Sequence, residues 1–138
     1  FSSEYLFDVI ICNPPFHEDQ LQSKHTQKNI AHHSSCLSIN NLMEQSKSLL
    51  KETGQLHILL PYYRTQEAIE IANNHQLHCK EIIYVKDSIH KDYLRSMLTF
   101  QLNKNDNVEK EEIIIKQENG TYSSQFITLL KDYYLYID

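Results

Sequence analysis

Apolar residues along the chain follow two different periods, and each period predicts a different kind of element. Residues 7–12 are apolar at every position except Asp8, which is typical of a strand buried on both faces of a parallel sheet. Shorter apolar runs predict further strands at residues 56–60, 81–85, 97–102 and 113–116.

Helical spacing of apolar residues separates and follows these strands. A helix that starts near Ile39 is expected to end at Gly54, because glycine favours the C-cap position. A second helix is expected over residues 64–75 and a third over residues 122–133.

Strands that alternate with helices predict an α/β fold with a mostly parallel sheet. The last two strands of this alternation, 81–85 and 97–102, are joined by a short polar turn. Because parallel neighbours need a long crossover, this tight link predicts that the last strand runs antiparallel. We treat residues 1–138 as one domain.

Composition narrows the class of protein. The chain has 138 residues, 41% hydrophobic and 22% charged, with a net charge of −5, which argues weakly against a nucleic-acid surface on this chain alone. No apolar run reaches the roughly 18–20 residues of a membrane span, and no signal segment is visible. Cys12, Cys36 and Cys79 are predicted to be reduced core thiols. A cytoplasmic protein is therefore expected.

The candidate chemistry lies directly after the first strand, where the sequence reads Asn13-Pro14-Pro15-Phe16. In an open α/β sheet, ligands bind beyond the carboxyl ends of the strands. The side-chain oxygen of Asn13 and the carbonyl of Pro14 can accept both hydrogens of an amino group, which directs the nitrogen lone pair outward. Phe16 offers a flat face on which a base can stack. Asn-Pro is also a common turn initiator, but the strand before it and the aromatic residue after it favour a catalytic role.

Weaker candidates for substrate binding lie in two other segments. Residues 17–35 form a long polar stretch, as in a lid or a binding loop, and within it His17 and Lys24 could face phosphate. Tyr62, Tyr63 and Arg64 follow the second strand at the edge expected to carry Asn13, and aromatics with arginine suit nucleic acid. Tyrosines there could equally cover the core. The histidines of the long stretch fit no common metal pattern, so no metal site is predicted.

These residues resemble the S-adenosylmethionine-dependent amino-methyltransferases of the class I, Rossmann-like fold, and within them the tRNA1(Val) adenine-37 N6-methyltransferase family. Asn-Pro-Pro-Phe carries the wider resemblance. The narrower one rests on Phe7–Phe16, Ala31-His32-His33, Leu49-Leu50 with Gly54, Leu60-Pro61, and the tail from Tyr122 to Leu135.

The resemblance implies that the catalytic residues are Asn13, Pro14, Pro15 and Phe16, and that Asn13 also contributes to the cofactor site. Such enzymes hold S-adenosylmethionine mainly with a glycine-rich loop and an acidic residue in earlier strands, which have no counterpart here. The chain also begins at Phe1 rather than Met. We therefore expect the C-terminal half of an incomplete catalytic domain, which binds the cofactor weakly or not at all and is inactive alone.

Several readings stay open from sequence. The acceptor implied by the resemblance is adenine N6 of tRNA, but adenine or guanine of rRNA or DNA, and a protein glutamine amide, present the same kind of NH2 group. A non-catalytic α/β module that binds nucleic acid is a further alternative. In a half-domain, residues 7–12 would be an exposed apolar edge, so we also expect a homodimer through this strand.

Overall fold

The computed structural model describes residues 5–15 and 38–134. Its elements in chain order are β1 (Phe7–Cys12), α2 (Ile39–Leu49), β2 (Leu50–Pro61), the 3-10 helix η1 (Tyr62–Arg64), α3 (Thr65–Asn74), β3 (His78–Ser88), β4 (Tyr93–Gln101), β5 (Glu109–Lys116) and α4 (Ser124–Leu130). All five predicted strands are present. No helix in the described part of the chain is long and apolar enough to cross a membrane.

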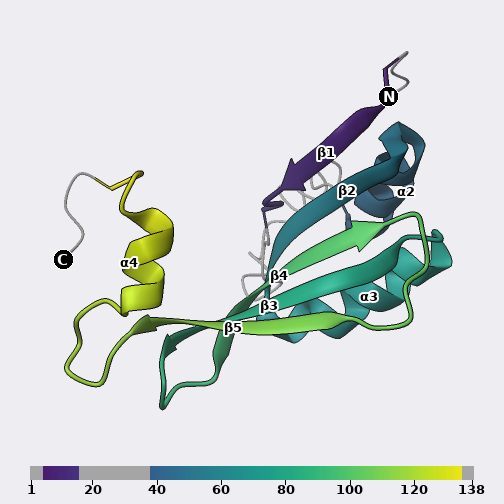
Figure 1. The fold of residues 1–138 in the computed structure, drawn as a ribbon. Helices are drawn as coiled ribbons and strands as arrows, with labels where there is room; N and C mark the ends of the chain where they lie inside the picture. The colour runs from purple at the N-terminus through teal and green to yellow at the C-terminus, as the bar shows by residue number, and fades with distance from the viewer. Residues whose placement is uncertain (1–4, 16–37, 135–138) are drawn as a thin grey trace, which may run out of the picture.

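The strands form one sheet in the order β1-β2-β4-β3-β5 (Figure 1). β1 is parallel to β2 and β3 is parallel to β5, whereas β4 is antiparallel to both of its neighbours. The predicted α/β class is confirmed, with a mostly parallel sheet and an antiparallel strand over the 97–102 segment. That strand is inserted between β2 and β3, which leaves β1 and β5 at the two edges.

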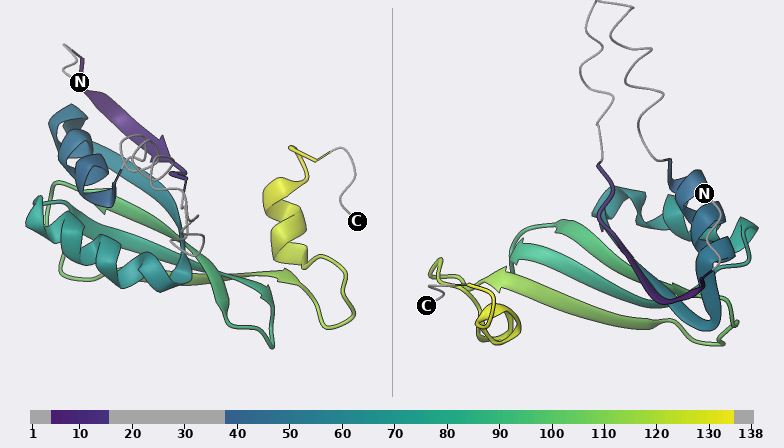
Figure 2. Two further views of the ribbon diagram at one scale, coloured as in Figure 1. Left: turned by 180° about the vertical axis from the view of Figure 1, so that it is seen from behind. Right: turned by 90° about the horizontal axis from the view of Figure 1, so that it is seen from above.

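Helices α2 and α3 cover the same face of the sheet (Figure 2). Alternate side chains of β2, those of Leu56, Ile58 and Leu60, are buried in the core, as expected from the two-residue period of a strand. α3 contributes the buried residues Ala68 and Ala72, and such small side chains let a helix lie close to a sheet. Each buried leucine or isoleucine contributes about 1.5–3 kcal/mol, so this layer holds the strand ends in place.

Gly54 does not cap a helix, so that prediction is wrong. α2 ends at Leu49 and its C-cap residue Leu50 is extended, while Gly54 lies inside β2. A Cβ atom at Gly54 would lie 2.7 Å from the carbonyl oxygen of Phe7. Glycine is needed here because β1 approaches β2 closely, at the point where their pairing shifts between Phe7 and Val9.

The C-terminal part projects away from the helical layer (Figure 1). After β5, a turn closes with Gly120 N–H donating to the carbonyl of Gln117 over 3.0 Å, with Gly120 at φ 85°. The predicted helix over 122–133 is shorter than expected, because Tyr122 instead bridges to Lys116 and Ser123 caps α4 at its start. α4 has no fully buried residue: Phe126, Ile127 and Leu130 are partly buried and Leu129 is exposed.

Candidate active site

The segment Asn13-Pro14-Pro15 lies where the sequence predicts it, directly after the carboxyl end of β1. Asn13 and Pro15 are exposed, whereas Pro14 is buried. Buried proline anchors the turn, since its ring fixes φ and it has no N–H to satisfy. The amide of Asn13 can therefore accept a hydrogen bond from a molecule outside the sheet. Phe16, His17 and Lys24 lie outside the described residues.

The pairing of β1 with β2 places a second functional segment beside this turn. Cys12 lies opposite Ile58, and the same register carried forward brings Pro15 level with Pro61, the last residue of β2. Neighbouring strands lie about 4.8 Å apart. The 3-10 helix η1, with Tyr62, Tyr63 and Arg64, therefore follows β2 at the same edge of the sheet as the Asn-Pro-Pro segment. The expectation that these residues share one sheet edge is met.

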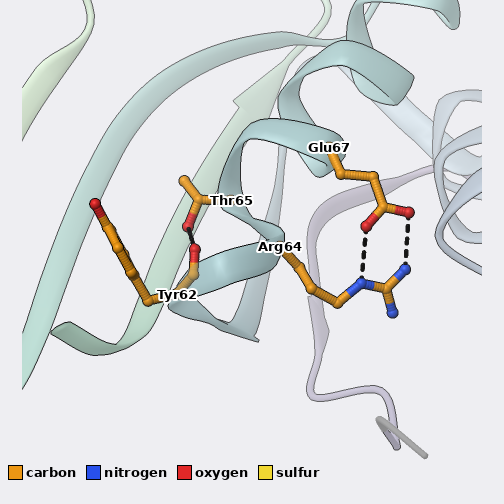
Figure 3. A network of polar contacts seen from close by, with 4 residues as sticks. All are labelled: Tyr62, Arg64, Thr65 and Glu67. Atoms are coloured by element: carbon orange, nitrogen blue, oxygen red, sulfur yellow. Dashed lines mark hydrogen bonds and ion pairs between the residues drawn. The ribbon is translucent and has the colours of Figure 1, made fainter. Parts of the chain in front are cut away.

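The ring of Tyr62 is held in a cluster of three tyrosines. Its centroid lies 5.8 Å from that of Tyr84 and 4.9 Å from that of Tyr93, and Tyr84 and Tyr93 are themselves 4.9 Å apart. The ammonium group of Lys86 lies 4.6 Å from the centre of the Tyr93 ring, a cation–π distance. Thr65 fixes the backbone of the turn, since its hydroxyl donates to the carbonyl of Tyr62 over 2.6 Å (Figure 3).

The tyrosine cluster also contains a charged pair. Glu112 lies 3.2 Å from the ammonium group of Lys86. Its carboxylate accepts a hydrogen bond from Tyr93, which lowers the pKa of Glu112 and raises that of Tyr93. Burial raises the pKa of Tyr84. The phenols of Tyr84 and Tyr93 therefore stay protonated and able to donate hydrogen bonds at neutral pH.

Arg64 points away from the Tyr62 ring and forms an ion pair with Glu67 (Figure 3). Two hydrogen bonds, each 2.9 Å long, join its guanidinium to the carboxylate. This contact raises the pKa of Arg64 and lowers the pKa of Glu67. The geometry gives Arg64 a structural role at the start of α3, because the guanidinium is already shared before any substrate arrives. A direct contact between Arg64 and substrate stays a prediction.

Sequence reasoning did not single out Tyr84, Lys86 and Tyr93, which complete this edge. The sequence contained only a weak indication of this cluster. Tyr84 and Lys86 are two residues apart near the end of one strand, and Tyr93 is the first residue of the next. Such spacing places the first two on one face. Tyr93 joins them only because the pairing of β3 and β4 is irregular between Val85 and Lys86. The sequence does not predict this irregularity.

A second polar network crosses the sheet on the face opposite α2 and α3. The hydroxyl of Thr99 in β4 lies 3.1 Å from Nδ1 of His57 in β2 and donates to Glu81 in β3 over 3.2 Å. Thr99 is buried, so these two contacts satisfy a hydroxyl that would otherwise lack partners. The network joins three adjacent strands, and its His57 lies opposite Ile11, two residues before Asn13, in the register of β1 and β2.

Other candidate chemistry is limited in the described residues. No group of three or more His, Cys, Asp or Glu side chains in residues 5–15 and 38–134 could hold a metal ion. Cys12 and Cys79 are free thiols, and burial raises the pKa of both, that of Cys79 to about 11. Neither is an activated nucleophile, as expected of reduced thiols in or near the core. Cys36 lies outside the described residues.

Comparison with known proteins gives a consistent result. The family model described as "Methyltransferase small domain" matches residues 2–82. Two curated relatives are named tRNA1(Val) (adenine(37)-N6)-methyltransferase. That of Flavobacterium psychrophilum is 31% identical over 94% of this chain and 55% of its own length. That of Aliivibrio salmonicida is 30% identical over 95% of this chain and 55% of its own length.

A solved structure shares the fold. It is the crystal structure of a predicted O-methyltransferase, protein Atu636 from Agrobacterium tumefaciens, with a TM-score of 0.65 and 14% identity. The match covers 96% of this chain and 54% of that one. The chain thus spans about half the length of the curated relatives and of the solved structure that it matches.

Proposed function

Because this chain belongs to the methyltransferase small domain family, we propose that it supplies the acceptor-binding part of an S-adenosylmethionine-dependent methyltransferase. The acceptor is an exocyclic amino nitrogen, adenine N6 of tRNA. One observation carries the proposal: the exposed Asn13, anchored by the buried Pro14, lies at the carboxyl end of a parallel strand. A protein with this role would work in the cytoplasm, where tRNA is modified.

The amide and the proline carbonyl perform complementary parts of the chemistry. An adenine amino group is a poor nucleophile because its lone pair is delocalised into the ring. The Asn13 side-chain oxygen accepts one N–H bond and the Pro14 carbonyl accepts the other, which favours a pyramidal nitrogen with its lone pair directed outward. Neither acceptor has to ionise. Both dipoles stabilise the positive charge that develops on the nitrogen.

The described residues do not fit the methyl donor. S-adenosylmethionine supplies the electrophilic methyl group when it is bound, and a glycine turn beside the catalytic strand would let backbone approach it. Of the two glycines, Gly54 lies inside β2 and Gly120 lies beyond β5, at the opposite edge of the sheet from β1. The isolated chain is therefore expected to bind S-adenosylmethionine weakly or not at all and to be inactive alone.

The choice of tRNA adenine over other acceptors is supported by the names of the relatives, which specify adenine 37 of tRNA1(Val). The rival acceptors are adenine or guanine of rRNA or DNA, and a glutamine amide of protein. All present an NH2 group that Asn13 and Pro14 could hold. The site therefore supports an amino acceptor, and the relatives support the identity of the base.

The test uses the longer protein to which we expect this chain to belong. Labelled methyl transfer from S-adenosylmethionine is measured with tRNA, rRNA, DNA and total protein as separate acceptors. Transfer to tRNA is expected, with a rate that falls about 10²-fold or more in Asn13→Ala, as when one catalytic hydrogen bond is removed. Asn74→Ala, the same change at an exposed position at the end of α3, is the control.

Two other outcomes would contradict the proposed function. Transfer to protein or DNA in preference to tRNA would replace the proposed acceptor. A rate that is the same in Asn13→Ala and in the parent protein would overturn the catalytic role of Asn13. The hypothesis of a non-catalytic module that binds nucleic acid would then be favoured.

A further inference from the structure

We propose that the edge of the sheet where β2 ends and β4 begins carries a docking site for single-stranded RNA, formed by Tyr62, Tyr63 and Arg95. The inference rests on the proposed function and extends it, because it assigns residues to the nucleotides that flank the target base. It concerns a surface beside Asn13 rather than the reacting atoms.

Tyr62 provides a rigid aromatic platform. Its ring is fixed between Tyr84 and Tyr93 at centroid distances of 5.8 and 4.9 Å, yet it is still 40% exposed. The backbone beneath it is fixed by Thr65, whose hydroxyl also lies 2.7 Å from that of the buried Ser96. An aromatic ring that is held in place loses little conformational entropy when a base stacks on it.

Tyr63 is the residue that simple packing does not explain. It is 66% exposed, although it lies between Tyr62, which joins the aromatic cluster, and Arg64, which is bound to Glu67. Every base has an apolar face that can stack on such a ring, so an exposed tyrosine at this position suits unpaired nucleotides.

Arg95 supplies the cation for a phosphate at this edge. It is exposed and lies opposite Pro61 in the pairing of β2 with β4. Its side chain is on the sheet face opposite the helices, because the neighbouring Ser96 contacts Thr65 of α3 and side chains alternate along a strand. An RNA strand on Tyr62 therefore reaches Arg95 across the end of the sheet. Other cations nearby are engaged, since Arg64 is paired with Glu67 and Lys86 with Glu112. Arg95 has no ion-pair partner in the described part of the chain. Its guanidinium can bind two phosphate oxygens at once.

The position of this surface connects it to the proposed reaction. β1 and β2 are parallel, with Cys12 opposite Ile58, so the Asn13 segment and the platform both follow strands that end at the same edge of the sheet. An RNA strand that presents a base to Asn13 would pass over Tyr62 and Tyr63. A peptide acceptor would gain less here, because stacking on tyrosine and a phosphate contact to arginine both favour a nucleic acid.

The first test measures binding of this chain to a labelled single-stranded oligoribonucleotide of about 12 nucleotides, a length that matches typical single-strand sites. Fluorescence anisotropy is followed over a range of salt concentrations. Tyr63→Ala is expected to weaken binding about 10-fold, and Tyr63→Phe, which keeps the ring, should bind like the parent chain. Arg95→Gln should weaken binding and reduce the slope of log affinity against log salt by about 0.7.

The control is Tyr133→Ala, the same change at a residue that is 84% exposed beyond α4, and it should leave affinity unchanged. Circular dichroism verifies that each variant is folded. The proposal is overturned if the parent chain does not bind the oligonucleotide, or if Tyr63→Ala and Arg95→Gln bind as the parent does. Binding that falls equally in Tyr133→Ala would also overturn it, because the effect would then not belong to this surface.

A second readout separates this proposal from the proposed function. In the longer protein, Tyr63→Ala and Arg95→Gln should raise the KM for tRNA with little change in kcat, whereas Asn13→Ala should lower kcat. Loss of activity in Asn13→Ala with an unchanged KM in the other two variants would refute the docking site and leave the enzyme standing. RNA binding that depends on Tyr63 and Arg95, combined with full activity in Asn13→Ala, would support the docking site and refute the catalytic role of Asn13.

Discussion

At the scale of single residues, the Asn13-Pro14-Pro15 segment could be placed from sequence alone. An apolar run followed by Asn13 and two prolines predicts that the strand ends before Asn13, and the structure places Asn13 directly after the strand. The role of Arg64 could not be predicted in the same way. Its pairing with Glu67 at an i,i+3 spacing depends on where α3 begins, and sequence patterns locate helix starts less well than helix centres.

Gly54 gives the first prediction at this scale. In Gly54→Ala the new methyl group would lie 2.7 Å from the backbone oxygen of Phe7 and 3.0 Å from that of Lys51, and neither atom can move without shifting a strand. We expect the free energy of unfolding to fall by about 2 kcal/mol, as for overpacked sites, when measured by urea denaturation.

The comparison for this variant is Gly120→Ala. Gly120 has no atom within 4 Å of an added Cβ but adopts φ +85°, so its substitution should cost about 1 kcal/mol from backbone strain alone. If Gly54→Ala were as stable as the parent chain, the close approach of β1 to β2 would be contradicted.

The pair of Arg64 and Glu67 gives a pH-dependent prediction. Because Arg64 lowers the pKa of Glu67 in the folded state, its stabilisation is fully present above the unfolded pKa of about 4.3 and is lost as the pH falls through the lower folded value. The Glu67 side chain is 49% exposed, so solvent screening limits the effect of Glu67→Gln to less than about 1 kcal/mol at pH 7.

Urea denaturation of the parent chain and Glu67→Gln at neutral and at acidic pH measures this effect. The difference in the free energy of unfolding should shrink towards zero as the acidic end is approached. A difference that grows on acidification would mean that the ion pair does not stabilise the start of α3.

At the scale of elements, periodicity predicted the presence and type of each strand and of α3, and it failed where a contact distant in sequence decides. Gly54 follows a helical segment, as a C-cap would, but its position is set by Phe7 in another strand. The terminal helix is shorter than its apolar spacing suggests, because the bridge from Tyr122 to Lys116 holds its first turn in another conformation. Both errors concern ends of elements, where local preference is weak.

The network across β2, β4 and β3 gives a prediction about how these strands are held together. Thr99→Val keeps the shape of the side chain but removes the hydroxyl that joins His57 and Glu81. Since their partner is lost at a buried position, we expect the free energy of unfolding to fall by about 1–3 kcal/mol. Thr53→Val, the same change at an exposed residue of β2, is the control. Equal stability of the two variants would show that the network contributes nothing.

At the scale of the whole molecule, the order of strands in the sheet could not be predicted from the sequence. The short link between β3 and β4 predicts that they pair, and they do. That β4 also pairs with β2, and so lies inside the sheet, depends on contacts between residues about 40 positions apart in sequence, such as Ile58 with Leu98. Local patterns do not encode such partners.

Within residues 5–15 and 38–134, β1 is an edge strand with β2 as its one neighbour, which leads to a prediction of association. Val9 and Ile11 are 52% and 79% exposed, although the strand is apolar enough to be buried on both faces. Open apolar edges pair with other chains, so the 138-residue chain is expected to dimerise through residues 7–12. Sedimentation velocity should show a mass that rises with concentration, and Ile11→Lys should abolish the rise. A monomer at every concentration would rule out this pairing.

The most direct test of the central claim is single-turnover methyl transfer to tRNA by the longer protein to which we expect this chain to belong, with N6-methyladenosine detected by mass spectrometry. Removing the Asn13 amide should lower the rate constant for the chemical step by about 10²-fold or more, while Asn74→Ala leaves it unchanged. Formation of N6-methyladenosine at the same rate in Asn13→Ala and in the parent enzyme would contradict the assignment of the Asn13 corner as the site that holds the amino group.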